Sequence, residues 1–230
     1  MIVLGLDASS DAAAVGLMAD GRLLCEYTLN NGKNHSVKLL PAVENMLRDT
    51  ELCFSDIDVY ACGVGPGSFT GVRIGVATVK GFAQSWEKPT VAMSSLQLLA
   101  ENIRGFDGLR VAAVCARADE LYCAAYNAQD EAVLPPSVLT VGELSAFLSD
   151  KECMTVGDGA LQYEKELSGK GVQTAWPLAH TISGGTAAGL GYRLAQKGEL
   201  ISYCDIAPMY LRASQAEREY LLKHEHIQVK

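Results

Sequence analysis

An internal repeat constrains this chain most strongly, because the order of elements predicted for its first half recurs in its second half. Hydrophobic periodicity predicts in each half three strands, then a helix, a strand, a helix, a strand and a closing helix. The first half has predicted strands at 2–7, 12–19, 22–29, 59–64 and 89–93 and helices at 36–50, 71–86 and 95–104. The second half has predicted strands at 109–116, 120–127, 132–134, 153–156 and 172–175 and helices at 141–149, 161–167 and 186–197. Such a repeat predicts two similarly folded lobes with a cleft between them.

The repeated order matches the duplicated ribonuclease-H-like core of the actin, heat-shock chaperone and sugar-kinase group, which is an α/β fold. We therefore predict an N-terminal lobe at 1–105, a C-terminal lobe at 106–203 and a tail with a helix at 204–230. No apolar stretch approaches the roughly 20 residues of a membrane span. The apolar N-terminus lacks the basic flank of a secretory signal, so we expect a cytoplasmic protein that does not contact a membrane.

Charge and cysteine usage exclude two kinds of site. The net charge of -8 argues against a protein that grips a nucleic-acid backbone by itself, since that requires clustered Lys and Arg. The 7 cysteines are scattered and none has C-x-x-C spacing, so a zinc ribbon is not indicated. We expect buried, reduced thiols.

The densest motif is the glycine-rich stretch at positions 65–75, which predicts a tight turn from a strand into a helix. Thr70 is placed to cap that helix. A helix N-terminus can bind an anion, but the Lys and Ser/Thr of a phosphate-binding P-loop are missing after Gly71. Taken alone, the loop is interpreted as structural; its residues are Gly65, Pro66, Gly67, Ser68, Phe69, Thr70 and Arg73.

The helix predicted at 71–86 has two stripes suited to close contact. One is a ridge of small residues that would let another backbone approach, and the other is apolar. Burial between the sheet and its neighbours and a subunit interface both explain these stripes, and both readings stay open. The stripes are Gly71, Gly75, Thr78 and Ser85, and Val72, Val76, Val79, Ala83 and Trp86.

Several further motifs follow one another in a family-specific order over nearly the whole chain. They are Asp7-Ala8-Ser9-Ser10, His35-Ser36 with Leu39-Leu40-Pro41, Arg117 with Glu120 and Tyr122, Gly157-Asp158-Gly159, and Tyr210-Leu211-Arg212. Together with positions 65–75 and 77–81, they resemble the bacterial TsaB (YeaZ) family. The resemblance implies an actin-like two-lobed fold and an accessory role in making threonylcarbamoyladenosine in tRNA. It also implies pairing with the catalytic relative TsaD and with the small ATPase TsaE.

Some positions depart from the pattern of the relatives. The catalytic relative holds a metal with two histidines one helical turn apart, whereas here His35 is followed by Leu39. We therefore predict no metal site. Cys115 and Ala118 replace the charged residues usual in the family beside Arg117, and His224 and His226 are interpreted as surface residues.

A stand-alone actin-like kinase or hydrolase using ATP is the alternative reading. Its nucleotide contacts would be Asp7, Ser9, Ser10, Gly184 and Gly185. However, positions 116–119 lack glycine and contain an arginine where a second phosphate loop would lie. A direct tRNA-binding module is a third reading, which the acidic composition disfavours.

Our leading prediction is a non-catalytic subunit that supports TsaD together with TsaE. It would contact tRNA only indirectly and bind no cofactor of its own, while ATP is used elsewhere in the pathway. In the absence of TsaD the same surface would close on itself as a homodimer. The predicted partner interface consists of Ser36, Leu39, Leu40, Val43, Leu47, Gly71, Val72, Gly75, Val76 and Val79.

Overall fold

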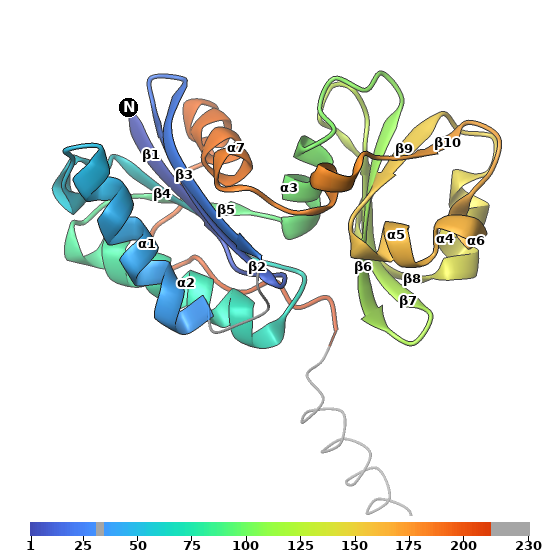
Figure 1. Ribbon diagram of the computed structural model, residues 1–230, viewed down its shortest axis with the longest axis horizontal. Coiled ribbons are helices and arrows are strands. Elements are labelled where there is room, and N and C mark those ends of the chain that lie inside the picture. The colour runs from blue at the N-terminus through green and yellow to red at the C-terminus, as the bar shows by residue number, and fades with distance from the viewer. Residues whose placement is uncertain (31–34, 213–230) are drawn as a thin grey trace, which may run out of the picture.

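The computed structural model describes residues 1–30 and 35–212, with side chains from residue 38 onward in the second range. It contains two five-stranded sheets side by side, one from each half of the chain (Figure 1). The first half comprises β1 (Ile2–Asp7), β2 (Ala12–Ala19), β3 (Arg22–Asn30), α1 (His35–Asp49), β4 (Val59–Gly63), α2 (Phe69–Ser85), β5 (Thr90–Met93) and α3 (Ser95–Glu101). The second half comprises β6 (Leu109–Arg117), β7 (Glu120–Tyr126), β8 (Ala132–Thr140), α4 (Val141–Leu148), β9 (Cys153–Val156), α5 (Asp158–Gln162), α6 (Glu164–Leu167), β10 (Val172–Thr174) and α7 (Gly184–Gln196).

The two sheets have the same topology, which confirms the predicted repeat. The first has the order β3-β2-β1-β4-β5 and the second the order β8-β7-β6-β9-β10. In each sheet the first three strands form an antiparallel meander, and the last two add in parallel beside the first strand. The predicted α/β fold class is therefore confirmed. Within the residues described here, no helix is long and apolar enough to span a membrane.

The last helix of each half, α3 or α7, packs on the sheet of the other half. Helices α1 and α2 pack on one face of the first sheet, and α7 packs on its other face (Figure 1). Helix α3, which closes the first half, packs instead on β6 and β7 of the second sheet. In space, therefore, the last helix of each half packs on the sheet of the other half. The predicted lobe boundaries at 105/106 and 203/204 follow the repeat along the chain, and they stay a prediction.

The central strand β1 is buried on both faces, as its continuous apolar sequence predicts. Val3 belongs to the core that continues through α7 and α3 toward the second sheet. Leu4 and Leu6 belong to the core under α1 and α2. The first sheet therefore separates two cores, and α1 and α2 lie on its outer side.

Three local predictions need correction. Strand β8 extends to Thr140 rather than ending at 134, and it tolerates Pro135 and Pro136 because it is an edge strand. The helix predicted at 161–167 begins at Asp158 and is divided into α5 and α6. Thr70 does not cap α2, because the cap is Ser68, whose Oγ accepts a hydrogen bond from the Gly71 N–H at 3.2 Å. The helix predicted in the tail falls largely beyond residue 212, outside the described residues.

A network of ion pairs joins α3 and α7 to the second sheet at the lobe junction. Buried Arg110 contacts Asp130 at 2.5 Å, and Arg104 contacts Asp130 at 3.1 Å and Glu101 at 3.0 Å. Arg193 of α7 contacts Glu101 at 2.5 Å. Burial raises the pKa of Asp130, but the hydrogen bond from Arg110 and the nearby arginine charges outweigh it and hold that pKa below its ordinary value.

We expect the substitution Asp130→Asn to lower the free energy of unfolding by about 1.5 kcal/mol at neutral pH, because it leaves Arg110 buried without its counter-charge. A depressed folded pKa stabilises the fold above the unfolded pKa near about 4, and this contribution is lost as the pH falls through the folded value. Urea unfolding at pH 7 and at acidic pH measures the difference in free energy of unfolding between the wild type and the variant, and this difference should shrink as the pH falls. The substitution Asp107→Asn, at an exposed position, is the control. A difference in free energy of unfolding that does not change with pH would contradict a stabilising ion pair between Asp130 and Arg110.

Candidate functional site

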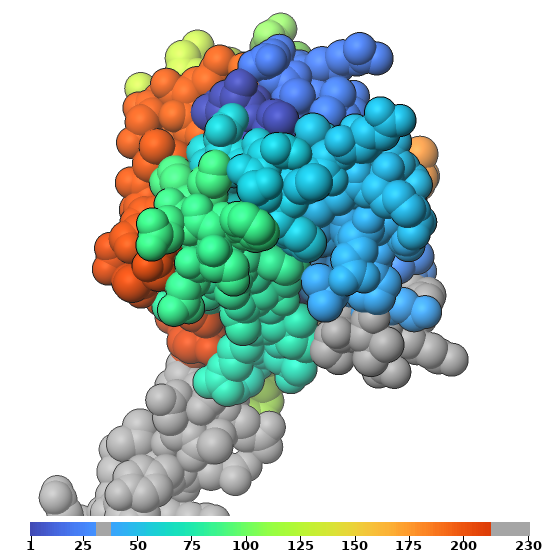
Figure 2. Space-filling view, turned by 90° about the vertical axis from the view of Figure 1, so that its left-hand side faces the viewer, coloured from blue at the N-terminus to red at the C-terminus, as the bar shows by residue number. Residues whose placement is uncertain are grey.

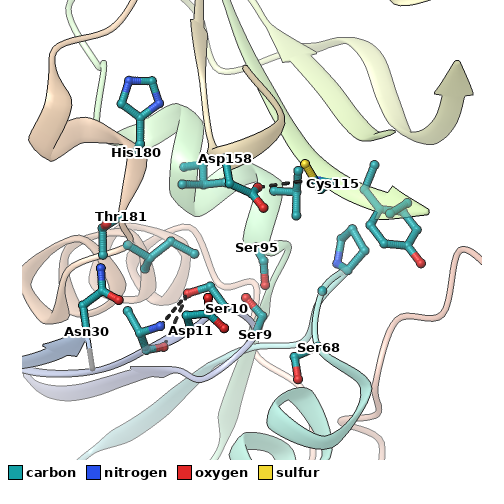
Figure 3. A pocket seen from close by; sticks show the side chains of 18 residues that line it. Ser9, Ser10, Asp11, Asn30, Ser68, Ser95, Cys115, Asp158, His180 and Thr181 are labelled. Carbon is teal, nitrogen blue, oxygen red and sulfur yellow. Dashed lines mark hydrogen bonds between the residues drawn. The ribbon is translucent and has the colours of Figure 1, made fainter. Parts of the chain in front are cut away.

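A cavity of about 410 Å³ lies between the two lobes and is lined by residues of both (Figure 3). Its walls come from the β1–β2 corner, the end of β3, the glycine-rich loop and α3 on one side. The other side is formed by β6, β7, the start of α5 and the segment before α7. The lining residues are Ser9, Ser10, Asp11, Ala12, Asn30, Pro66, Gly67, Ser68, Ser95, Leu99, Val114, Cys115, Ala116, Tyr122, Asp158, His180, Thr181 and Ile182.

Of the residues predicted to bind a nucleotide, only Ser9 and Ser10 line this cavity. Asp7 is fully buried at the end of β1. Its carboxylate accepts hydrogen bonds from the Ser9 N–H at 3.0 Å, the Ser9 hydroxyl at 2.9 Å and the Ser95 hydroxyl at 3.0 Å. The carboxylate therefore ties the β1–β2 corner to α3.

The structure places Gly184 and Gly185 away from the cavity, at the start of α7 against β2 and β3. The Gly184 N–H donates to the Thr28 hydroxyl at 3.1 Å, and the Gly185 N–H donates to the Glu26 carboxylate at 2.5 Å. A Cβ atom on Gly184 would lie 2.0 Å from the Val15 carbonyl oxygen, so the glycine permits close approach to β2. These amides cap the helix on the sheet, and the structure does not bring them together with Ser9 and Ser10.

The titratable groups of the cavity give it an acidic character. Asp11 and Asp158 line it, whereas no Lys or Arg does so among the residues described. The Asp158 carboxylate accepts a hydrogen bond from the Cys115 N–H at 3.3 Å. Burial, with a contribution from Asp158, raises the pKa of the Cys115 thiol to about 11, so this thiol is protonated at neutral pH.

His180 supplies no free base to the cavity, because both ring nitrogens are engaged by the backbone. Nδ1 lies 3.1 Å from the Gly157 amide nitrogen and 3.0 Å from the Gly157 carbonyl oxygen, and Nε2 lies 2.9 Å from the Ala175 carbonyl oxygen. Across the described ranges, no group of three or more His, Cys, Asp and Glu side chains is placed to hold a metal. The side chain of His35 and the whole of His224 and His226 lie outside the described residues.

The glycine-rich loop is pressed against the β1–β2 corner. The Ser68 N–H donates to the Ser9 carbonyl at 2.6 Å, and a Cβ atom on Gly67 would lie 2.2 Å from the same oxygen. Gly65 has φ of 99°, a backbone conformation that favours glycine, and its carbonyl accepts from the Ser95 N–H at 2.8 Å. These contacts support the interpretation of the loop as a structural link that forms one wall of the cavity.

Burial corrects the predicted partner interface on α1 and α2. Most of its residues point into the core of their own lobe and cannot contact a partner: Leu39, Val43, Leu47, Gly71, Val72, Gly75, Val76 and Val79. Leu40 is the exception, with 44% of its surface exposed, and the Ser36 side chain lies outside the described residues. The apolar and small faces of both helices serve the first sheet, so a partner surface here has to use the opposite faces.

The opposite faces of α1 and α2 lie side by side on one side of the molecule (Figure 2). This outward face contains Leu40 and Pro41 from α1 and Phe69, Thr70, Arg73, Ala77 and Gln84 from α2, all exposed. Sequence reasoning included Phe69 and Arg73 only as loop residues. The residues of the outward face do not form a periodic apolar pattern, so the sequence contains no signal that this face is available to a partner.

Two lobes of identical topology with a cleft between them place the chain in the actin-like class of α/β proteins. A family model described as "TsaD: tRNA N6-adenosine threonylcarbamoyltransferase" matches residues 23–175. A *Bacillus subtilis* protein named tRNA threonylcarbamoyladenosine biosynthesis protein TsaB is 30% identical over 96% of this chain and 98% of its own length. The *Escherichia coli* protein of the same name is 35% identical over 69% of this chain and 72% of its own length. The chain belongs to the TsaB (YeaZ) family.

Solved structures agree with this assignment. YeaZ from *Pseudomonas aeruginosa* superimposes with a TM-score of 0.79 at 29% identity, covering 91% of this chain and 99% of that one. An activator of 2-hydroxyisocaproyl-CoA dehydratase from *Clostridium difficile* superimposes with a TM-score of 0.50 at 10% identity over 91% of this chain and 100% of that one, which shows the shared fold alone.

Proposed function

We propose that this chain is a non-catalytic subunit in the biosynthesis of threonylcarbamoyladenosine in tRNA, which binds and supports a TsaD-like catalytic subunit together with a TsaE-like ATPase. The two TsaB relatives, named for threonylcarbamoyladenosine biosynthesis, support the pathway. The composition of the cleft carries the non-catalytic reading. Asp7 is held by Ser9 and Ser95, and the described lining offers two carboxylates without a lysine or arginine to bind phosphates.

The remaining parts of the proposal follow from charge and exposure. With a net charge of -8, the chain would meet tRNA only through its partner. It would bind no cofactor of its own, while ATP is consumed by other components in the cytoplasm. The outward face of α1 and α2 would bind the catalytic subunit, and in its absence the same face would pair two copies of this chain.

The proposed function is tested by reconstitution with purified components and tRNA. Leaving this chain out should abolish formation of modified adenosine, and adding it back should restore it. The chain with tRNA and the threonylcarbamoyl donor, without the catalytic subunit, should form no product. Full activity without this chain, or product formation by this chain alone, would contradict the proposal.

A further inference from the structure

The segment after α7, here called the strap (residues 201–212), runs along the first lobe beside α2 (Figure 1). Ile201 exchanges two backbone hydrogen bonds with Thr90, of 2.8 and 2.9 Å, at the edge of the first sheet. Ile206 is fully buried in the core under α1 and α2. The Met209 N–H then donates to the Val64 carbonyl at 2.7 Å, beside the glycine-rich loop. The strap is therefore anchored at Ile201, Ile206 and Met209 along the first lobe.

At its end the strap completes a cluster of two aromatic rings and one arginine. The Arg73 guanidinium lies 3.6 Å from the centre of the Phe69 ring and 5.7 Å from the centre of the Tyr210 ring. The two rings lie 5.1 Å apart, and the Arg73 Nε–H donates to the Tyr210 hydroxyl at 2.7 Å. Phe69 is 39% exposed and Tyr210 is 48% exposed, so the cluster lies at the surface.

The cluster orients the guanidinium but uses only one of its nitrogens. Within residues 1–30 and 35–212, neither terminal nitrogen of Arg73 has a hydrogen-bond partner, and the residue is exposed. A guanidinium stacked on aromatic rings has lost much of its rotamer freedom and presents a planar fork of donors that matches a carboxylate. Ordering the arginine before binding reduces the entropy that association would otherwise lose.

We propose that Arg73, held by Phe69 and Tyr210, is a recognition site for a carboxylate on the surface of the catalytic subunit. This inference rests on the proposed function and adds to it the chemistry of one contact. Arginine and aromatic residues together dominate many protein interfaces. The site lies on the outward face of α2, where the partner surface is proposed.

Charge favours a protein carboxylate over a nucleic-acid phosphate. Binding a phosphate backbone requires several clustered cations. Two other cations of the strap and α2 are engaged: Arg212 of the strap pairs with Glu120 of the second lobe, and the Lys80 ammonium donates to the Cys204 carbonyl at 3.2 Å. The free guanidinium fork of Arg73, on a chain of net charge -8, suits a single carboxylate.

The test is calorimetric titration of the full chain with the purified catalytic subunit. Arg73→Gln should weaken binding at least about tenfold. Arg73→Lys, which keeps the charge and loses the fork, should recover only part of that loss. Arg22→Gln is the matched control, because it removes the same charge from an exposed position on β3, and its affinity should equal that of the wild type.

Hydrogen exchange at the Met209 amide separates recognition from simple fastening of the strap. Weakened binding with unchanged exchange supports the site, whereas weakened binding with faster exchange means that Arg73 only fastens the strap, and overturns it. If Arg73→Gln instead weakens binding of tRNA to this chain, the ligand of Arg73 is a phosphate, and the proposal of a carboxylate ligand is overturned. Wild-type affinity in Arg73→Gln overturns this site alone, while failure of the unaltered chain to bind the catalytic subunit overturns the proposed function as well.

Discussion

Replacing Gly71 with alanine is expected to lower the free energy of unfolding by about 2 to 3 kcal/mol, although alanine is the better helix former. A Cβ atom at this position would lie 1.9 Å from the carbonyl oxygen of Ala8. That oxygen belongs to the backbone of the β1–β2 corner, which cannot move aside as a flexible side chain could. Helix α2 would have to move away from β1, and the packing of its buried face would be lost.

Gly81 provides the matched control in the same helix. Outside its own stretch of helix, a Cβ atom there meets no heavy atom of the described residues within 4 Å, so Gly81→Ala should stabilise the protein by about 0.5 to 1 kcal/mol. Guanidinium unfolding of both variants measures the difference directly. Similar values for the two variants would show that the close approach of α2 to Ala8 does not constrain the fold.

The glycines of α2 illustrate what the sequence can and cannot predict. Gly71 and Gly75 at helical spacing correctly indicate that something approaches the helix closely. The structure shows that β1 and its corner approach it: a Cβ atom on Gly75 would lie 3.2 Å from the Leu6 side chain. A small-residue stripe carries no information on whether its neighbour is the same chain or another, so the partner interpretation was not determined by the pattern.

Topology was predictable from the order of elements, but the exchange of helices was not. Periodicity identifies the apolar face of α3 and α7 without indicating which sheet covers it. Their positions depend on contacts distant in sequence, such as the Asn102 side-chain amide, which donates to the Ala179 and Thr181 carbonyls at 2.7 and 2.8 Å. Such contacts join the two segments that cross between the lobes, and no local pattern encodes them.

The candidate site was predicted in part for similar reasons. Ser9 and Ser10 line the cleft as the polar corner after β1 suggested. The burial of Asp7 and the use of the Gly184 and Gly185 amides by β3 depend on tertiary packing. The cluster around Arg73 joins residues more than one hundred positions apart. The sequence signalled its parts separately, as the motif at positions 65–75 and the Tyr210-Leu211-Arg212 motif, and nothing in the sequence indicated that the two motifs meet.

The burial pattern of α2 separates folding from partner binding in two adjacent residues. From the sequence alone, Gly75→Arg or Val76→Arg would be the test of the partner interface. Val76 is 4% exposed and packs in the core under α1 and α2, whereas Ala77 is exposed on the outward face, one helical turn after Arg73.

We expect Val76→Arg to prevent stable folding, because it places an unpaired charge in an apolar core. Ala77→Arg should unfold at the same denaturant concentration as the wild type, since an exposed helical alanine tolerates the change. The same variant should bind the catalytic subunit at least about 100-fold more weakly, because a bulky charge would enter the centre of the proposed interface. Circular dichroism and calorimetric titration measure the two effects. If a folded Ala77→Arg variant binds with wild-type affinity, the partner surface does not lie on the outward face of α2. If Val76→Arg folds stably, the burial of Val76, on which the placement of the interface on the outward face depends, is contradicted.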